Sequence, residues 1–140
     1  MAYTIGIEEE FFLYDRQSCA PLADMNERFL LEAKQACGER VQREMLQCQI
    51  EIVTRPHQRV RDARLELAGL RGTLDMLGRA HDIGIAASGT NPLANWREQK
   101  LTQKERYGQI NDDLGMIGLR NVVCGVHVHV APPEAVDRIT

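Results

Sequence analysis

Two glutamates near the start of the chain could bind a divalent cation together. Glu8 and Glu10 are separated by one residue in segment 3–14 (YTIGIEEEFFLY), which has the pattern of a strand. Because successive side chains of a strand point to opposite faces, both carboxylates share one face, about 6.5–7 Å apart. Two like charges at this distance repel each other, and a bound cation would turn that repulsion into attraction. A solvated strand face is the alternative interpretation.

A second pair of carboxylates is expected on or near the next strand, residues 45–54 (MLQCQIEIVT). Glu51 lies in the middle of its alternating pattern, and Glu44 lies seven residues earlier. Seven is odd, so an ideal strand would place these two carboxylates on opposite faces. They can converge only if a bulge or a preceding loop intervenes. The alternative for Glu44 is a surface loop.

A third candidate is the pair of histidines in the expected strand 121–131 (NVVCGVHVHVA). His127 and His129 share one face, and Gly125 on that face leaves room for a ligand. The same H-x-H spacing occurs in zinc hydrolases, and two core histidines are a further alternative. Together with the glutamates, however, the donors are rich in oxygen, which suits Mg²⁺ or Mn²⁺ better than structural zinc.

The elements that must position these residues alternate between strands and helices. Strands with one apolar and one polar face favour an α+β fold, in which a mainly antiparallel sheet has helices packed on one face. Asp24 with Glu27 resembles a capping box for the first helix, and Gly38 and Gly84 are expected to end the first and second helices. Glu9 shares the face of the apolar residues, so we expect it at a strand edge or reaching into solvent. The other elements are expected over 25–37 (helix), 60–83 (helix), 85–88 (strand), 102–118 (helix) and from 134 onward (helix).

Composition narrows the class of protein. The formal net charge is −3, so no basic excess points to nucleic acid or to an anionic membrane. No segment approaches the ~18 apolar residues of a membrane span, and the first residues lack the pattern of a signal peptide. The four cysteines match neither a zinc motif nor a compact disulfide framework. We therefore expect a cytoplasmic protein without nucleic-acid or membrane partners.

Five short segments occur in an order that is more specific than any one of them. These segments are 6–11 (GIEEEF), 47–54 (QCQIEIVT), 89–92 (GTNP), 106–107 (RY) and 124–130 (CGVHVHV). The ordered set resembles the carboxylate–amine ligase branch of the glutamate–cysteine ligase type 2 family, which is related to glutamine synthetase. The resemblance covers essentially the whole chain.

The resemblance implies a partial glutamine synthetase-like catalytic domain, with ATP and Mg²⁺ (or Mn²⁺) on the polar face of its sheet. For Arg106 and Tyr107 it suggests no role beyond helix packing. By motif position, the implied metal ligands are Glu8, Glu10, Glu44, Glu51 and His127, of which His127 would also contact phosphate, and His129 would contact the nucleotide or the substrate.

The implied reaction joins small-molecule amino acid substrates. Transfer of the γ-phosphoryl group of ATP to a carboxylate makes an acyl phosphate, and an amine displaces the phosphate to form an amide. Members of the family are usually well over twice this long, so residues 1–140 are expected to be the N-terminal part of a truncated catalytic domain. Two alternatives stay open: a non-catalytic metal-binding module that assembles with other copies through a sheet edge, and a zinc hydrolase built on His127 and His129.

Overall fold

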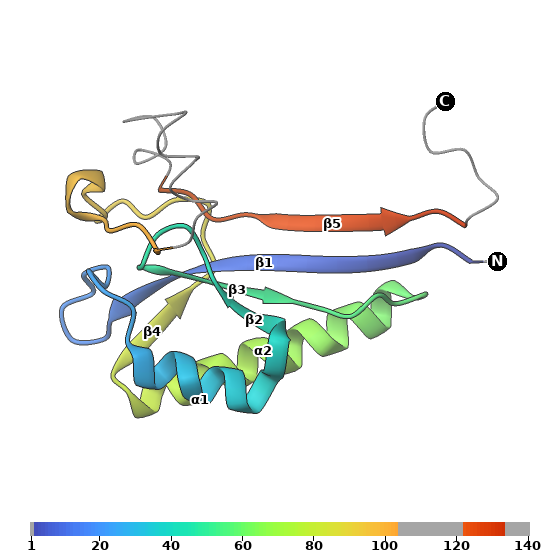
Figure 1. Cartoon of the computed structure of the whole chain (residues 1–140), viewed down its shortest axis with the longest axis horizontal. Coiled ribbons are helices and arrows are strands. Elements are labelled where there is room, and N and C mark those ends of the chain that lie inside the picture. Colours follow the sequence, from blue (N-terminus) through green and yellow to red (C-terminus); the bar gives the residue numbers. More distant parts are fainter. Residues whose placement is uncertain (1, 104–121, 134–140) are drawn as a thin grey trace.

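The described part of the chain forms a five-stranded antiparallel sheet with two helices on one face, which confirms the predicted α+β class. The computed structural model describes residues 2–103 and 122–133. Helices α1 (Glu27–Cys37) and α2 (Val60–Ala80) form one layer below the sheet in Figure 1. Within the described residues, the opposite face of the sheet carries no α-helix. In the part of the chain that the structure describes, the architecture is therefore α+β with both helices on one side of the sheet.

The long strand β1 (Thr4–Asp15) organises the sheet. It pairs along one edge with β3 (Gln49–Val53), which in turn pairs with β2 (Val41–Arg43). Along its other edge it pairs first with β5 (Val126–Ala131) and then, nearer its C-terminal end, with β4 (Ile83–Ala86). All of these pairings are antiparallel. β1 therefore pairs directly with β3, β4 and β5, and β2 joins the sheet through β3.

The main core lies between the sheet and the two helices. One face of β1 contributes Phe11 and Leu13, and α2 contributes an apolar stripe that includes Leu70 and Leu74. Fully burying a large apolar side chain stabilises the fold by about 1.5–3 kcal/mol. The other buried members are Met25, Phe29, Leu30, Ala33, Cys37, Val41, Ile50, Ile52 and Ile83. This core fixes which face of β1 points away from the helices.

A second, smaller core covers one end of the opposite sheet face. Phe12, Leu46, Cys48, Val122 and Cys124 are its buried members. The uniform alternation predicted for residues 45–54 was therefore wrong, because a turn at residues 47–48 interrupts it and β3 begins only at Gln49. Leu46 and Cys48 thus belong to this second core, whereas the isoleucines of β3 pack against the helices.

The capping prediction for α1 was wrong by two residues at its start. Asn26, not Asp24, is the N-cap, and its Oδ1 accepts a hydrogen bond of 3.0 Å from the backbone N–H of Phe29. The predicted end is confirmed, because Gly38 caps the helix with a φ of 65°, in the left-handed region that favours glycine.

The second helix is shorter than predicted. It ends at Ala80 with His81 as its C-cap, and the chain reverses at Asp82, whose φ is 57°. Gly84 is therefore not a helix cap but lies within β4, opposite Tyr14. The strand predicted over 85–88 accordingly begins and ends two residues earlier.

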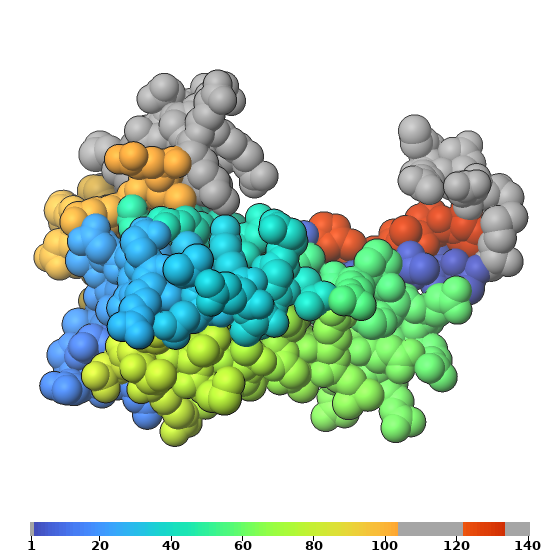
Figure 2. Space-filling view, turned by 60° about the horizontal axis from the view of Figure 1, so that its bottom comes forward, coloured from blue at the N-terminus to red at the C-terminus, as the bar shows by residue number. Residues whose placement is uncertain are grey.

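The C-terminal part of the described chain includes β5, a strand whose residues are all exposed. β5 is shorter than the predicted 121–131, and its valines Val126, Val128 and Val130 are exposed on the helix side of the sheet. In Figure 2, which is turned toward the helical layer, α1 and α2 fill the foreground and the red β5 stays visible beyond them. The helices predicted over 102–118, with Arg106 and Tyr107, and from 134 onward lie outside the described residues, except that residues 102–103 are not helical. Among the described helices, none is long and apolar enough to cross a bilayer.

Candidate functional site

Three carboxylates converge on the sheet face that points away from the helices. Glu10, Glu44 and Glu51 each offer an oxygen atom, and these oxygens all lie within 4.8 Å of one another. Glu10 and Glu51 are direct partners in the antiparallel pairing of β1 with β3, so their side chains share one face. This spacing lets one small cation contact all three residues.

A tight reversal before β3 brings Glu44 into this group. Glu44 directly follows β2, whose Gln42 pairs with Glu51, and its carboxylate lies beside those of Glu10 and Glu51. The odd spacing between Glu44 and Glu51 is thus resolved because the two residues belong to different arms of a hairpin. The reversal contains no Gly, Pro or Asn, and this absence explains why the sequence did not reveal β2 as a separate strand.

Burial and repulsion from neighbouring carboxylates raise the pKa of Glu10 and of Glu51. The pKa of Glu51 rises to about 7, first because the group is partly buried and then because Glu44, Glu8 and Glu10 are negatively charged. The pKa of Glu10 is also raised by burial, although a hydrogen bond from the backbone N–H of Gly125 opposes the shift. Without a cation, Glu51 therefore takes up a proton at a higher pH than an ordinary carboxyl group does.

Glu8 and the two histidines form a neighbouring polar group on the same face. His127 of β5 lies directly opposite Glu8, and His129 lies opposite Gly6. A carboxylate oxygen of Glu8 is 3.0 Å from Nε2 of His129 and 3.6 Å from Nδ1 of His127. Both imidazoles are more than half exposed. The structure thus brings all six predicted site residues to one sheet face in two adjacent groups, and their individual roles stay predictions.

Gly125 connects the carboxylates to β5 through its backbone. Its N–H donates a 2.8 Å hydrogen bond to the Glu10 carboxylate, and its carbonyl accepts a 3.1 Å hydrogen bond from the Glu10 N–H. A side chain added at Gly125 would meet only the ring of His127, at an ordinary contact distance of 3.5 Å. Its backbone contacts with Glu10, which the sequence did not predict, are thus the clearest contribution of this residue.

Glu9 lies on the face where its parity places it, but it is not exposed. Its side chain is only 2% exposed, and its carboxylate accepts two hydrogen bonds from the guanidinium of Arg71 in α2. The expectation of a strand edge or a solvent-reaching side chain was therefore wrong. The partner is 62 residues away in sequence, so no local pattern could have identified it.

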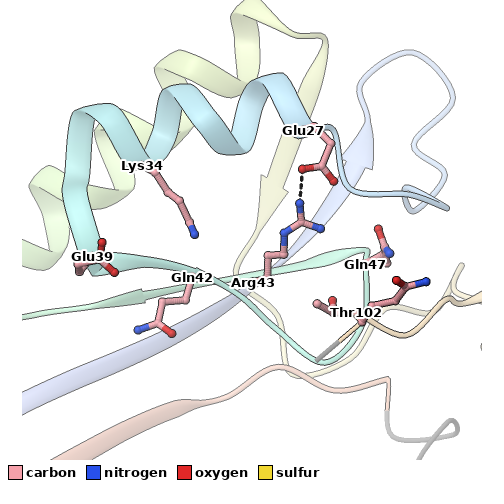
Figure 3. Close-up of a pocket in the computed structure, with 8 residues that line it drawn as sticks. Glu27, Lys34, Glu39, Gln42, Arg43, Gln47 and Thr102 are labelled. Atoms are coloured by element: carbon pink, nitrogen blue, oxygen red, sulfur yellow. Dashed lines mark hydrogen bonds and ion pairs between the residues drawn. The ribbon is translucent and has the colours of Figure 1, made fainter. Parts of the chain in front are cut away.

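A separate cavity lies between α1 and β2, and it is lined by residues of both elements. It has a volume of about 480 Å³, and Figure 3 shows Lys34 of α1 pointing into it. Arg43 on its wall forms an ion pair with Glu27. None of the six predicted site residues lines this cavity, so it is not part of the carboxylate site.

Comparison with known proteins identifies the family. The model of glutamate–cysteine ligase family 2 (GCS2) matches residues 4–140. The chain belongs to this family. The matched range contains both polar groups of the sheet, so the GCS2 assignment covers the whole candidate site.

Curated GCS2 relatives are much longer than this chain. A protein of Ectopseudomonas mendocina is 44% identical over 97% of the chain, which corresponds to 36% of the relative. A protein of Bradyrhizobium diazoefficiens is 40% identical over 98% of the chain and 32% of the relative. Both carry the name "Putative glutamate–cysteine ligase 2". The chain therefore spans about a third of the length of these relatives.

Solved structures share the fold at low sequence identity. Glutamate–cysteine ligase of Francisella tularensis, solved in complex with AMP, matches 94% of the chain and 27% of its own length, with a TM-score of 0.71 and 15% identity. A bifunctional glutathione synthetase of Pasteurella multocida matches 91% of the chain and 17% of its own length, with a TM-score of 0.66 and 14% identity. The GCS2 chain thus has the fold of part of a glutamate–cysteine ligase.

Proposed function

We propose that this chain supplies metal-binding residues for an ATP-dependent ligation between a carboxylate and an amine, of the glutamate–cysteine type. The observation that carries the proposal is the convergence of Glu10, Glu44 and Glu51 within 4.8 Å on an open sheet face. Burial and, after it, repulsion from neighbouring carboxylates raise the pKa of Glu51, so its charged form is unfavourable here. A bound cation would remove that cost.

The donor atoms fit Mg²⁺ or Mn²⁺. Both ions prefer oxygen ligands, and all three residues of the converging group offer carboxylate oxygens. Glu8 and His127, in the adjacent polar group, are candidate ligands for a second ion, and His127 is also a candidate contact for phosphate oxygens. A divalent ion at such a site would neutralise charge on transferring phosphates.

The remaining candidate residue of this sheet face is His129. His129 is the more exposed of the two histidines, so we propose that it contacts the nucleotide or the substrate. AMP in the related Francisella tularensis ligase supports the use of ATP. In the proposed reaction, a substrate carboxylate takes the γ-phosphoryl group of ATP and ADP leaves. An amine then attacks the acyl carbon of the acyl phosphate, the carbon–oxygen bond to phosphate breaks, and inorganic phosphate and a proton of the amine leave as the amide forms.

A metal-binding module without ligase activity is the second candidate. The chain spans about a third of the length of its relatives. Among the described strands, none pairs with the outer edge of β5. An open edge of this kind can add another strand, so the module could assemble with other copies of the chain.

The test is isothermal titration of the chain with MnCl₂ and MgCl₂, with and without a non-hydrolysable ATP analogue. We expect saturable cation binding that Glu10→Gln abolishes and Glu39→Gln leaves unchanged, because Glu39 is an exposed carboxylate outside the site. Equal binding by both variants would overturn the proposed site. ATP-dependent phosphate release with glutamate and cysteine then separates the ligase from the binding module.

A further inference from the structure

The ion pair between the buried Glu9 and the half-exposed Arg71 lies on the opposite side of β1 from the carboxylates. We propose that Glu9 and Arg71 act as positioning residues that hold Glu8 and Glu10 on the metal-binding face. This inference rests on the proposed function, because it concerns the same carboxylates. It adds to that function a residue of α2, on the other side of the sheet.

The contacts of Arg71 hold two residues of β1 at once. Its Nε donates a 2.6 Å hydrogen bond to the Glu9 carboxylate, and its Nη2 makes a second contact with the other carboxylate oxygen. Its guanidinium also lies 5.9 Å from the centre of the Phe11 ring. A planar, two-pronged contact of this kind fixes orientation as well as distance. The alternate side chains of β1 on the helix side are thereby tied to α2.

The pair lies beside a break in the strand pairing along one edge of β1. On one edge of β1, β5 ends its pairing at Glu9 and β4 begins only at Phe12. Between them, the hydrogen bonds between Glu10 and Gly125 are the link to the neighbouring chain on that edge. A cavity of about 300 Å³ occupies this gap, and both Glu10 and Arg71 line it. On this edge, β1 therefore lacks a continuous neighbouring strand next to Glu10, a proposed metal ligand.

Because side chains alternate along a strand, the contact that holds Glu9 against α2 also fixes where Glu8 and Glu10 point. In a strand, holding one side chain on one face places its two neighbours on the other face. Glu9 is 2% exposed, so without Arg71 its charge would be buried and unpaired. The strand would then gain by rotating Glu9 toward water, and this rotation would displace Glu8 and Glu10 from their partners.

The first measurement compares Mn²⁺ affinity among variants of the 140-residue chain. Arg71→Met should weaken Mn²⁺ binding roughly 10- to 100-fold, the range typical for residues that orient metal ligands. The double variant Glu9→Leu/Arg71→Met should recover most of the affinity, because an apolar pair keeps residue 9 on the helix side without a buried charge. Arg79→Met is the matched control, since Arg79 pairs with Asp75 on an exposed part of the same helix.

The second measurement does not need a metal. The Gly125 amide donates to the Glu10 carboxylate, so its hydrogen-exchange rate reports where that carboxylate lies. We expect faster exchange of this amide in Arg71→Met, recovery in the double variant, and no change in Arg79→Met. Exchange at core amides of α2 serves as the check that each variant is folded.

The outcomes separate this inference from the proposed function. Unchanged Gly125 exchange in a folded Arg71→Met variant would overturn the positioning role. A double variant as impaired as Arg71→Met would also overturn it, because the pair would then act through its charge. If the unmodified chain binds no Mn²⁺ while Gly125 exchange responds as expected, the metal site fails and the positioning of Glu10 stands.

Discussion

Replacing Glu51 by glutamine should stabilise the metal-free protein and weaken the metal-bound one. Burial and neighbouring carboxylates raise the pKa of Glu51 from 4.5 to about 7. The folded state therefore binds more protons than the unfolded state between these pH values. Stability from this group is fully present below pH 4.5 and is lost as the pH rises through 7. Glutamine has nearly the same shape and carries no charge, so it removes this loss.

The size of the effect follows from the shift. A rise from 4.5 to about 7 corresponds to about 3 kcal/mol, at 1.36 kcal/mol per pKa unit. Glu51 is only partly buried, so solvent screening reduces this to roughly 1–2 kcal/mol. At pH 8 without metal, Glu51→Gln should raise the free energy of unfolding by that amount, and at pH 4 it should change nothing. A cation at 100 times its dissociation constant should add about 2.7 kcal/mol to the unmodified chain alone.

The order of stability should therefore invert when metal is added. The assay is urea unfolding at pH 8, once with EDTA and once with saturating Mg²⁺, for the unmodified chain, Glu51→Gln and Glu39→Gln. Glu39 is exposed and outside the site, so its variant should follow the unmodified chain in both conditions. The reasoning would be refuted by a Glu51→Gln variant that is less stable in EDTA, or by Mg²⁺ stabilising that variant as much as the unmodified chain.

Two further predictions concern the scaffold. Leu74→Ala should lower the free energy of unfolding by about 2–5 kcal/mol in urea, because Leu74 is fully buried; Met76→Ala, on the exposed side of the same helix, should change it by less than about 0.5 kcal/mol, and equal effects would contradict the burial argument. Gly84→Ala should cost about 1–3 kcal/mol, because a Cβ at this position would lie 2.0 Å from the Tyr14 ring. Relief of that cost in a Gly84→Ala/Tyr14→Ala background would confirm the collision, and an undiminished cost would contradict it.

Short-range periodicity was the part of the fold that the sequence could predict well. The two-residue period of β1 placed Glu8 and Glu10 on one face, and the apolar stripe of α2 located the helix that covers the other face. Element boundaries were less accurate where a turn lacked its usual residues, as before β3, or where a glycine served a strand instead of a cap, as in β4. The first error arose because the local signal of a turn was absent, and the second arose because Gly84 pairs with Tyr14 in the sheet instead of ending the helix.

By itself, the sequence determined which donor groups the candidate site contains and the face of β1 on which Glu8 and Glu10 lie, because side-chain type and strand alternation are local properties of the chain. Only the tertiary structure decided how Glu44 reaches Glu51 and which residue neutralises Glu9. The position of Glu44 depends on the chain reversal between β2 and β3. The neutralisation of Glu9 depends on the packing of α2 under β1, which brings Arg71 to Glu9 from 62 residues away in sequence. Contacts of this kind depend on how whole elements pack together, so they cannot be predicted from the spacing of residues along the chain.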